Sequence, residues 1–304
     1  MALTIIGEYL GEMTDEDLAL FSRSLADAAA QSASLAIDPE GVDLVATGDF
    51  VQSVRDRFDN QAEAAAYTTD RGAGIVAART MPNTATGRVA VIIPAGFMLL
   101  QDEGGAELRR RTVTHELAHV AIYQAGEAST GCRQRLAGGT IAQADFVAIA
   151  GIAVEEFRAE LAVHEAGWDD EDNDISADVE AAHSAWRSAA EMVCASDFCG
   201  ALATAFQALN VLCQRLAYVT ASLVHQTGRD ELRAHRDESY VEVFMRALLD
   251  VPSGNERIDR GQIDVAIAHI AEAVRGFLLE VGFDYRDTPG PGAWFGFTGA
   301  YDGD

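Results

Sequence analysis

The motif His-Glu-x-x-His, which begins at His115, constrains the folding of this chain more than any other sequence feature. Its flanks favour one helix, because residues 106–125 contain many helix formers and Gly126 provides a stop. An apolar side recurs at helical spacing and consists of Val113, Leu117, Val120 and Ala121. Residues four apart lie one above the other on a helix. The motif therefore predicts a helix on which His115 and His119 face one metal ion, with Glu116 beside them.

The alternative interpretation is a surface helix with two unrelated histidines. The chain has seven histidines, and by composition a chance match to the motif is roughly a one-in-a-hundred event. Leu117, Val120 and Ile122 give the helix a buried character, and paired histidines in a buried helix need partners. The metal-binding interpretation is therefore the stronger one.

A second helical pattern supplies candidates for a third ligand, since a catalytic zinc ion usually takes three protein ligands and keeps a fourth position for water. Residues 139–167 read as a long helix rich in Ala, Ile and Val. Glu156, Glu160 and His164 recur in it every four residues and share one face. This stripe suits a metal site, and the alternative is a solvated polar face. Glu155 points about 100° away from this face of the helix, so we expect it to take no part in metal binding.

The two helices together resemble the gluzincin class of zinc metallopeptidases, in which His-Glu-x-x-His is followed by a glutamate on a later helix. Thermolysin-like members carry Glu-x-x-x-Asp there, and residues 156–160 match this pattern with Glu in place of Asp. The resemblance covers residues 89–164, about a quarter of the chain. It implies a Zn²⁺ cofactor, a peptide or protein substrate, and Glu116 as the general base that takes a proton from water.

The resemblance also implies His115, His119 and Glu156 as the metal ligands. Glu160 would then lie behind a ligand and orient it, as outer partners do in metal sites. The replacement of Asp by Glu leaves a second assignment open, with Glu160 as the ligand and Glu156 or His164 behind it. His164 lies two helical turns, about 12 Å, beyond Glu156 and is too far away to share one ion with it.

Two further questions about function stay open at this point. A metallopeptidase needs a donor for the developing oxyanion, and the sequence does not choose among the candidates His183, Tyr218, His225 and Tyr240. The chain could also be a zincin-like module that binds a partner without cutting it, as regulators of the ImmA/IrrE kind do. A structural zinc site is the third alternative.

The remaining pattern predicts an α+β fold. Short strands are expected at residues 3–6, 42–46, 74–79 and 88–94, and helices at residues 15–35 and 48–58. Residues 81–87 read as the turn between the last two strands. The resemblance implies that one of these two strands pairs with extended substrate, and the alternative is two ordinary core strands. Residues 168–174 match a calcium-binding EF-hand loop only weakly, so we interpret them as a solvated acidic linker.

Further helices are expected at residues 181–193, 200–225, 240–249 and 262–281. Residues 288–293 read as irregular, and the aromatic residues 294–297 are expected to pack back on the body. We therefore predict a zincin-like α/β lobe at residues 1–165 and a mainly helical lobe with an irregular tail at residues 166–304. The catalytic cleft would lie between these lobes, with the motif helix as its floor.

Composition narrows the function classes further. The apolar share of 49% suffices for a core, and no apolar run is long enough for a transmembrane helix. The start of the chain lacks the basic region of a secretory signal. Four cysteines lack zinc-finger spacing, and we interpret them as buried, reduced thiols in a cytoplasmic protein, with a disulfide between Cys194 and Cys199 as the less favoured alternative. The four cysteines are Cys132, Cys194, Cys199 and Cys213.

The net charge of -26 excludes some partners. It argues against nucleic acid and anionic membranes, and it favours neutral or basic substrates. Every basic residue other than histidine is Arg, because the chain contains no Lys. A GC-rich genome, adaptation to salt or avoidance of lysine-directed modification would each produce this composition. The substrate, the cleavage preference and the oligomeric state do not follow from the sequence.

Overall fold

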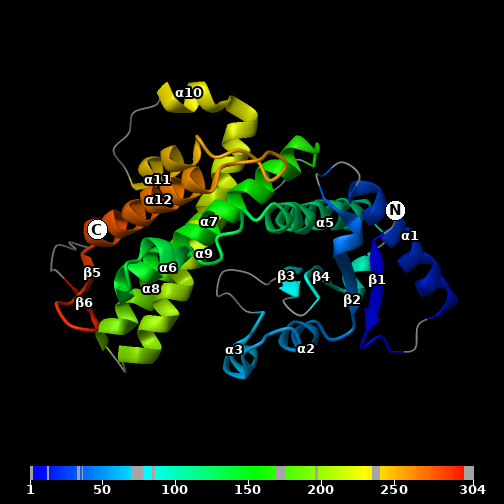
Figure 1. The fold of residues 1–304 in the computed structure, drawn as a ribbon, viewed down its shortest axis with the longest axis horizontal. Helices are drawn as coiled ribbons and strands as arrows, with labels where there is room; N and C mark the ends of the chain where they lie inside the picture. The colour runs from blue at the N-terminus through cyan, green and yellow to red at the C-terminus, as the bar shows by residue number, and fades with distance from the viewer. Residues whose placement is uncertain are drawn as a thin grey trace. The chain divides into compact units, whose positions relative to one another are not determined.

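The structure is a computed structural model that describes residues 3–11, 14–32, 35, 37–69, 78–83, 86–100, 102–168, 175–195, 198–234 and 240–297. It combines many helices with small sheets, as Figure 1 shows, and this confirms the predicted α+β class. The chain forms two compact units. Unit 1 contains Met1–Gly126 and Ala162–Asp170, and unit 2 contains Glu127–Leu161 and Glu171–Asp304.

Unit 1 is built on a four-stranded sheet with the strand order β1-β2-β4-β3. The strands β1 (Thr4–Glu8), β2 (Val42–Thr47) and β4 (Arg88–Pro94) are parallel to one another. The edge strand β3 (Arg79–Asn83) is antiparallel to β4. The strands β2 and β4 are almost entirely buried, as expected for parallel strands with helices on both faces.

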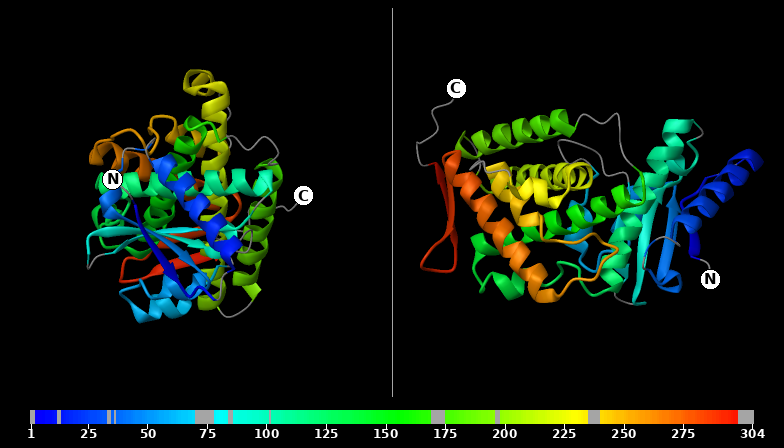
Figure 2. Two further views of the ribbon diagram at one scale, coloured as in Figure 1. Left: turned by 90° about the vertical axis from the view of Figure 1, so that its right-hand side faces the viewer. Right: turned by 90° about the horizontal axis from the view of Figure 1, so that it is seen from above.

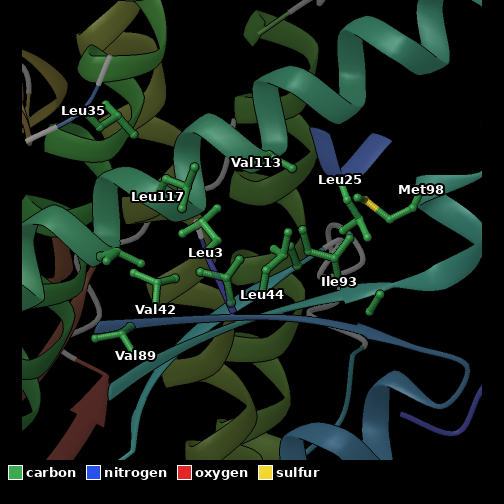
Figure 3. Packing of buried hydrophobic residues seen from close by; sticks show 14 of the residues in the cluster. Leu3, Leu25, Leu35, Val42, Leu44, Val89, Ile93, Met98, Val113 and Leu117 are labelled. Carbon is green, nitrogen blue, oxygen red and sulfur yellow. The ribbon is translucent and has the colours of Figure 1, made fainter. Parts of the chain in front are cut away.

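Helices cover both faces of this sheet (Figures 1 and 2). They are α1 (Asp15–Ser32), α2 (Phe50–Arg55), α3 (Gln61–Ala66), α4 (Ala95–Met98) and α5 (Glu103–Gln124), with a short 3-10 helix at Pro39–Gly41. On one face, Leu44 of β2 belongs to the same core cluster as Val113 of α5, as Figure 3 shows. The next residue, Val45, belongs to a cluster with Val54 of α2 on the other face. This alternation follows from the two-residue period of a strand.

Helix α5 confirms the helix predicted around the motif. At its start, the Asp102 carboxylate accepts a hydrogen bond of 2.5 Å from the Gly105 amide. The helix ends just before Gly126, whose φ of 69° lies in the left-handed region that glycine tolerates. The apolar side packs on the sheet, so His115 and His119 lie on a half-buried side of the helix.

The edge strand departs from the prediction. The predicted strand at residues 74–79 falls largely outside the described residues, and β3 instead runs through Pro82 into the segment predicted as a turn. Proline is tolerated there because an edge strand need not donate every main-chain hydrogen bond. The turn closes later, where the Gly87 amide donates to the Asn83 carbonyl oxygen at 2.8 Å.

Unit 2 is mainly helical. Its elements are α6 (Cys132–Leu136), α7 (Ile141–Glu165), α8 (Ile175–Ala195), α9 (Phe198–Thr227), α10 (Arg229–Ala234), α11 (Tyr240–Leu248), α12 (Arg260–Glu280), β5 (Phe283–Asp287) and β6 (Ala293–Phe297). Helix α8 packs along α9, and α11 packs along α12. The long helix α7 is continuous, although its residues from Ala162 onward belong to unit 1.

The C-terminal tail is more regular than predicted. Residues 288–292 form the loop of an antiparallel hairpin between β5 and β6. Phe295 stacks on Phe283, with 5.6 Å between the ring centroids, and packs beside Ala189 of α8. The expected packing of the aromatic tail is therefore confirmed for Phe295, whereas Trp294 is 43% exposed.

The structure also bears on two predictions from composition, which concern membrane-spanning helices and the cysteines. In the described part of the chain, no helix has both the length and the apolar character needed to cross a bilayer. Cys132 and Cys213 are free, buried thiols, as predicted. The side chains of Cys194 and Cys199, and residues 169–174 of the predicted acidic linker, lie outside the described part.

Candidate metal centre

The two motif histidines point at each other from adjacent turns of α5. Their Nε2 atoms are 3.2 Å apart, and their ring planes meet at 73°. The i, i+4 spacing on a regular helix is sufficient to produce this pairing. His115 and His119 therefore present two nitrogen donors toward one point in space.

The nitrogen spacing fits a shared zinc ion. Tetrahedral zinc binds imidazole nitrogen at about 2.05 Å, which places two such nitrogens about 3.3 Å apart. The observed separation of 3.2 Å is close to this value. Magnesium and calcium prefer oxygen donors, so an imidazole pair favours zinc or another first-row transition metal over them.

Glu156 of α7 belongs to the same group of potential ligands. His115, His119 and Glu156 each offer one ligand atom, and these atoms all lie within 4.8 Å of one another. Within the described ranges, no other set of three His, Cys, Asp or Glu side chains meets this condition. Two imidazoles and a glutamate form a donor set that catalytic zinc uses, with a fourth position open to water or substrate.

Tyr218 of α9 supports the Glu156 carboxylate. The Tyr218 hydroxyl donates a hydrogen bond of 2.7 Å to Oε2 of Glu156. Burial raises the pKa of Tyr218 well above its usual value, and the negative charge of Glu156 raises it further. The phenol therefore stays protonated at neutral pH and acts as a donor. Such a partner fixes the orientation of a ligand carboxylate.

The Glu116 carboxylate accepts a hydrogen bond from a residue of the unit 1 sheet. Its side chain is buried, and the Thr80 hydroxyl of β3 lies 2.6 Å from its Oε2 atom. The same hydroxyl lies 3.0 Å from the Glu116 main-chain oxygen. The sequence did not indicate this contact, because Thr80 falls between the strand predicted at residues 74–79 and the turn predicted at residues 81–87.

Glu155 and Arg158, which lie close to Glu156 in α7, form hydrogen bonds and an ion pair that stabilise the fold. Glu155 accepts a hydrogen bond from the Ser129 amide, so its carboxylate is engaged with a loop. Arg158 is 1% exposed and forms a 2.7 Å ion pair with Glu127. Its guanidinium group also donates to the main-chain oxygen of Glu256 at 2.9 Å. These contacts anchor α7 within unit 2.

Glu160 and His164 lie on the same helix and are buried. Neither belongs to the three-residue group within 4.8 Å. The negative charge of Glu160 also raises the pKa of Tyr218. A supporting role for Glu160 or His164, and the alternative assignment of Glu160 as a ligand, stay predictions.

The four oxyanion candidates are placed differently. Tyr218 contacts a potential ligand, as described above. His183 lies among aromatic rings, with its centroid 6.1 Å from those of Trp186 and Phe277, and burial lowers its pKa. His225 is exposed on the last turn of α9, and the side chain of Tyr240 lies outside the described part. The structure therefore gives no support to His183 as a donor in the site.

Comparison with known proteins adds no relative. No protein-family model, curated protein or solved structure matches this chain. The resemblance to the gluzincins therefore rests on the motif residues, their spacing and the geometry of the three potential ligands.

Proposed function

We propose that this chain is a zinc-dependent metallopeptidase. The observation that carries the proposal is the group of His115, His119 and Glu156, with its ligand atoms within 4.8 Å of one another. This group is built around a helix that also carries Glu116 in the motif position of a general base. The proposal includes a zincin-like lobe at residues 1–165 and a helical lobe at residues 166–304.

The residues of the site divide the chemistry among them. The chemistry that a zinc ion supplies at such a site is polarisation of the scissile carbonyl group and a lower pKa, about 7, for the attacking water. Glu116 accepts the proton of that water and later delivers it to the leaving amine. Tyr218 orients Glu156 through its 2.7 Å hydrogen bond, which engages the single proton of its hydroxyl group.

The edge strand β3 is the proposed binding element for the substrate backbone. It stands at the end of the sheet order, so among the described strands only β4 pairs with it. An extended peptide can add to such an edge through main-chain hydrogen bonds. The net charge of -26 favours peptides with neutral or basic side chains.

The test of the proposal is the Glu116→Gln variant. It should bind zinc as the wild type does and lose turnover of a peptide library by at least about 100-fold, since it removes the general base. Zinc content is measured by mass spectrometry of the dialysed protein. The control is Glu107→Gln, which removes the same charge from an exposed position of the same helix and should keep full activity.

The outcomes separate the competing functions. Full activity of zinc-loaded Glu116→Gln contradicts the mechanism, and failure of the wild type to bind zinc contradicts the metal site. Zinc binding without cleavage, together with a tightly bound protein partner, supports a regulatory zincin-like module instead. Zinc binding with a fourth protein ligand and no cleavage supports a structural site.

A further inference from the structure

One side chain of the sheet touches the proposed general base. Thr80 Oγ1 lies 2.6 Å from Oε2 of Glu116 and 3.0 Å from the main-chain oxygen of the same residue. A threonine hydroxyl carries a single proton. Because the distance to Oε2 is shorter and the carboxylate is negatively charged, the hydroxyl donates its proton in a charge-assisted hydrogen bond to Oε2.

The donor is fixed by the sheet. Thr80 is in register with Val91 of β4, a fully buried residue in the middle of the core. Its β-branched side chain has few accessible χ1 rotamers. Strand β3 also packs against α5, the helix that carries Glu116. The hydroxyl therefore holds a constant position relative to that helix.

A restrained carboxylate matters for proton transfer. A glutamate side chain has several rotatable bonds, and a base is effective only while it lies within hydrogen-bond reach of the proton. In the described part of the chain, Oε2 has Thr80 as its donor and no donor is found for Oε1. The contact thus holds one oxygen and leaves the other to accept a proton.

We propose that Thr80 is a positioning residue that holds the Glu116 carboxylate ready for proton transfer. This inference rests on the proposed peptidase function. Strand β3 then has two roles, because the strand proposed to receive the substrate backbone also orients the base. Correct formation of the edge strand would in this way be a condition for efficient turnover.

The test compares Thr80→Val with Thr80→Ser. Valine keeps the β-branched shape and removes the hydroxyl, whereas serine keeps the hydroxyl. With zinc-loaded protein and the best-cleaved peptide of a quenched fluorescent library, Thr80→Val should lower kcat by about 10- to 100-fold and change KM less than about twofold. Thr80→Ser should recover most of the lost kcat. The control is Thr4→Val, which removes a hydroxyl that accepts from Arg88 in the same sheet and should change neither constant.

A second measurement needs no turnover. Crystal structures of metal-free wild type and metal-free Thr80→Val should show one Glu116 rotamer in the wild type and several in the variant. A single unchanged rotamer in Thr80→Val, or an unchanged kcat, overturns the inference. If Glu116→Gln keeps its activity, the proposed mechanism itself fails. If Glu116→Gln is inactive and Thr80→Val is fully active, only the positioning role fails.

Discussion

At the residue scale, Glu156 and Glu160 have different expected roles although both lie on α7. Glu156 belongs to the group of potential ligands, and the buried Glu160 does not. We predict that Glu156→Ala loses most of the zinc affinity and that Glu160→Ala weakens it by about 10- to 100-fold, as loss of a supporting partner does. Competition with a chromophoric chelator measures both affinities.

Glu155→Ala is the matched control on the same helix. Its carboxylate is engaged with the Ser129 amide, so the variant should retain zinc even if it unfolds more easily. If Glu160→Ala strips the metal and Glu156→Ala retains it, the third ligand lies one helical turn further on. If neither variant changes the affinity, the third ligand lies elsewhere and the resemblance to the gluzincins fails.

Cysteine chemistry provides another prediction at the same scale. Burial raises the pKa of the Cys213 thiol to about 12 and also raises the pKa of Cys132. The thiolate is the reactive form, so at pH 8 only about one Cys213 thiol in 10⁴ is reactive. We expect both cysteines to resist a disulfide exchange reagent in native protein and to react rapidly in urea, as read by mass spectrometry. Rapid labelling of Cys213 in folded protein would contradict its burial.

At the scale of elements, α7 depends on a buried ion pair. Arg158 and Glu127 are 1% and 8% exposed, and their charged atoms are 2.7 Å apart. Removal of one partner leaves an uncompensated buried charge. We predict that Arg158→Met lowers the free energy of unfolding by about 3–5 kcal/mol, measured by urea denaturation. The double variant Arg158→Met with Glu127→Leu should recover part of this loss.

The control for burial is a second ion pair of nearly the same length. Arg133 and Asp145 are 2.6 Å apart, but the Arg133 side chain is 56% exposed. Arg133→Met should therefore cost no more than about 1 kcal/mol. Equal losses for the two arginine variants would show that burial does not determine the contribution of these pairs.

The same scale shows where sequence patterns were sufficient. The long helices α5, α7, α9 and α12 were predicted, because helical periodicity extends over many residues in each. The short helices α3, α6 and α10, of five or six residues, were missed, since so few residues show no clear period. The β5–β6 hairpin was missed because its loop contains two prolines and two glycines, which read as an irregular tail.

At the scale of the whole molecule, composition predicted general properties. The apolar share of 49% is consistent with the buried clusters on both faces of the unit 1 sheet. The net charge of -26 indicates which partners the surface can attract, but it does not predict the fold. The division into two units with α7 continuing from one into the other came only from the structure.

The sequence by itself determined the features that depend on neighbours along the chain. The pairing of His115 with His119 follows from four-residue spacing on one helix, and the strand at Arg88–Pro94 follows from a single apolar run. Tertiary structure alone decided the contacts that support the site. Thr80 and Glu116 are 36 residues apart in sequence, and Glu156 and Tyr218 are 62 apart. Such contacts depend on how strands and helices pack, and no local period in the sequence records that packing.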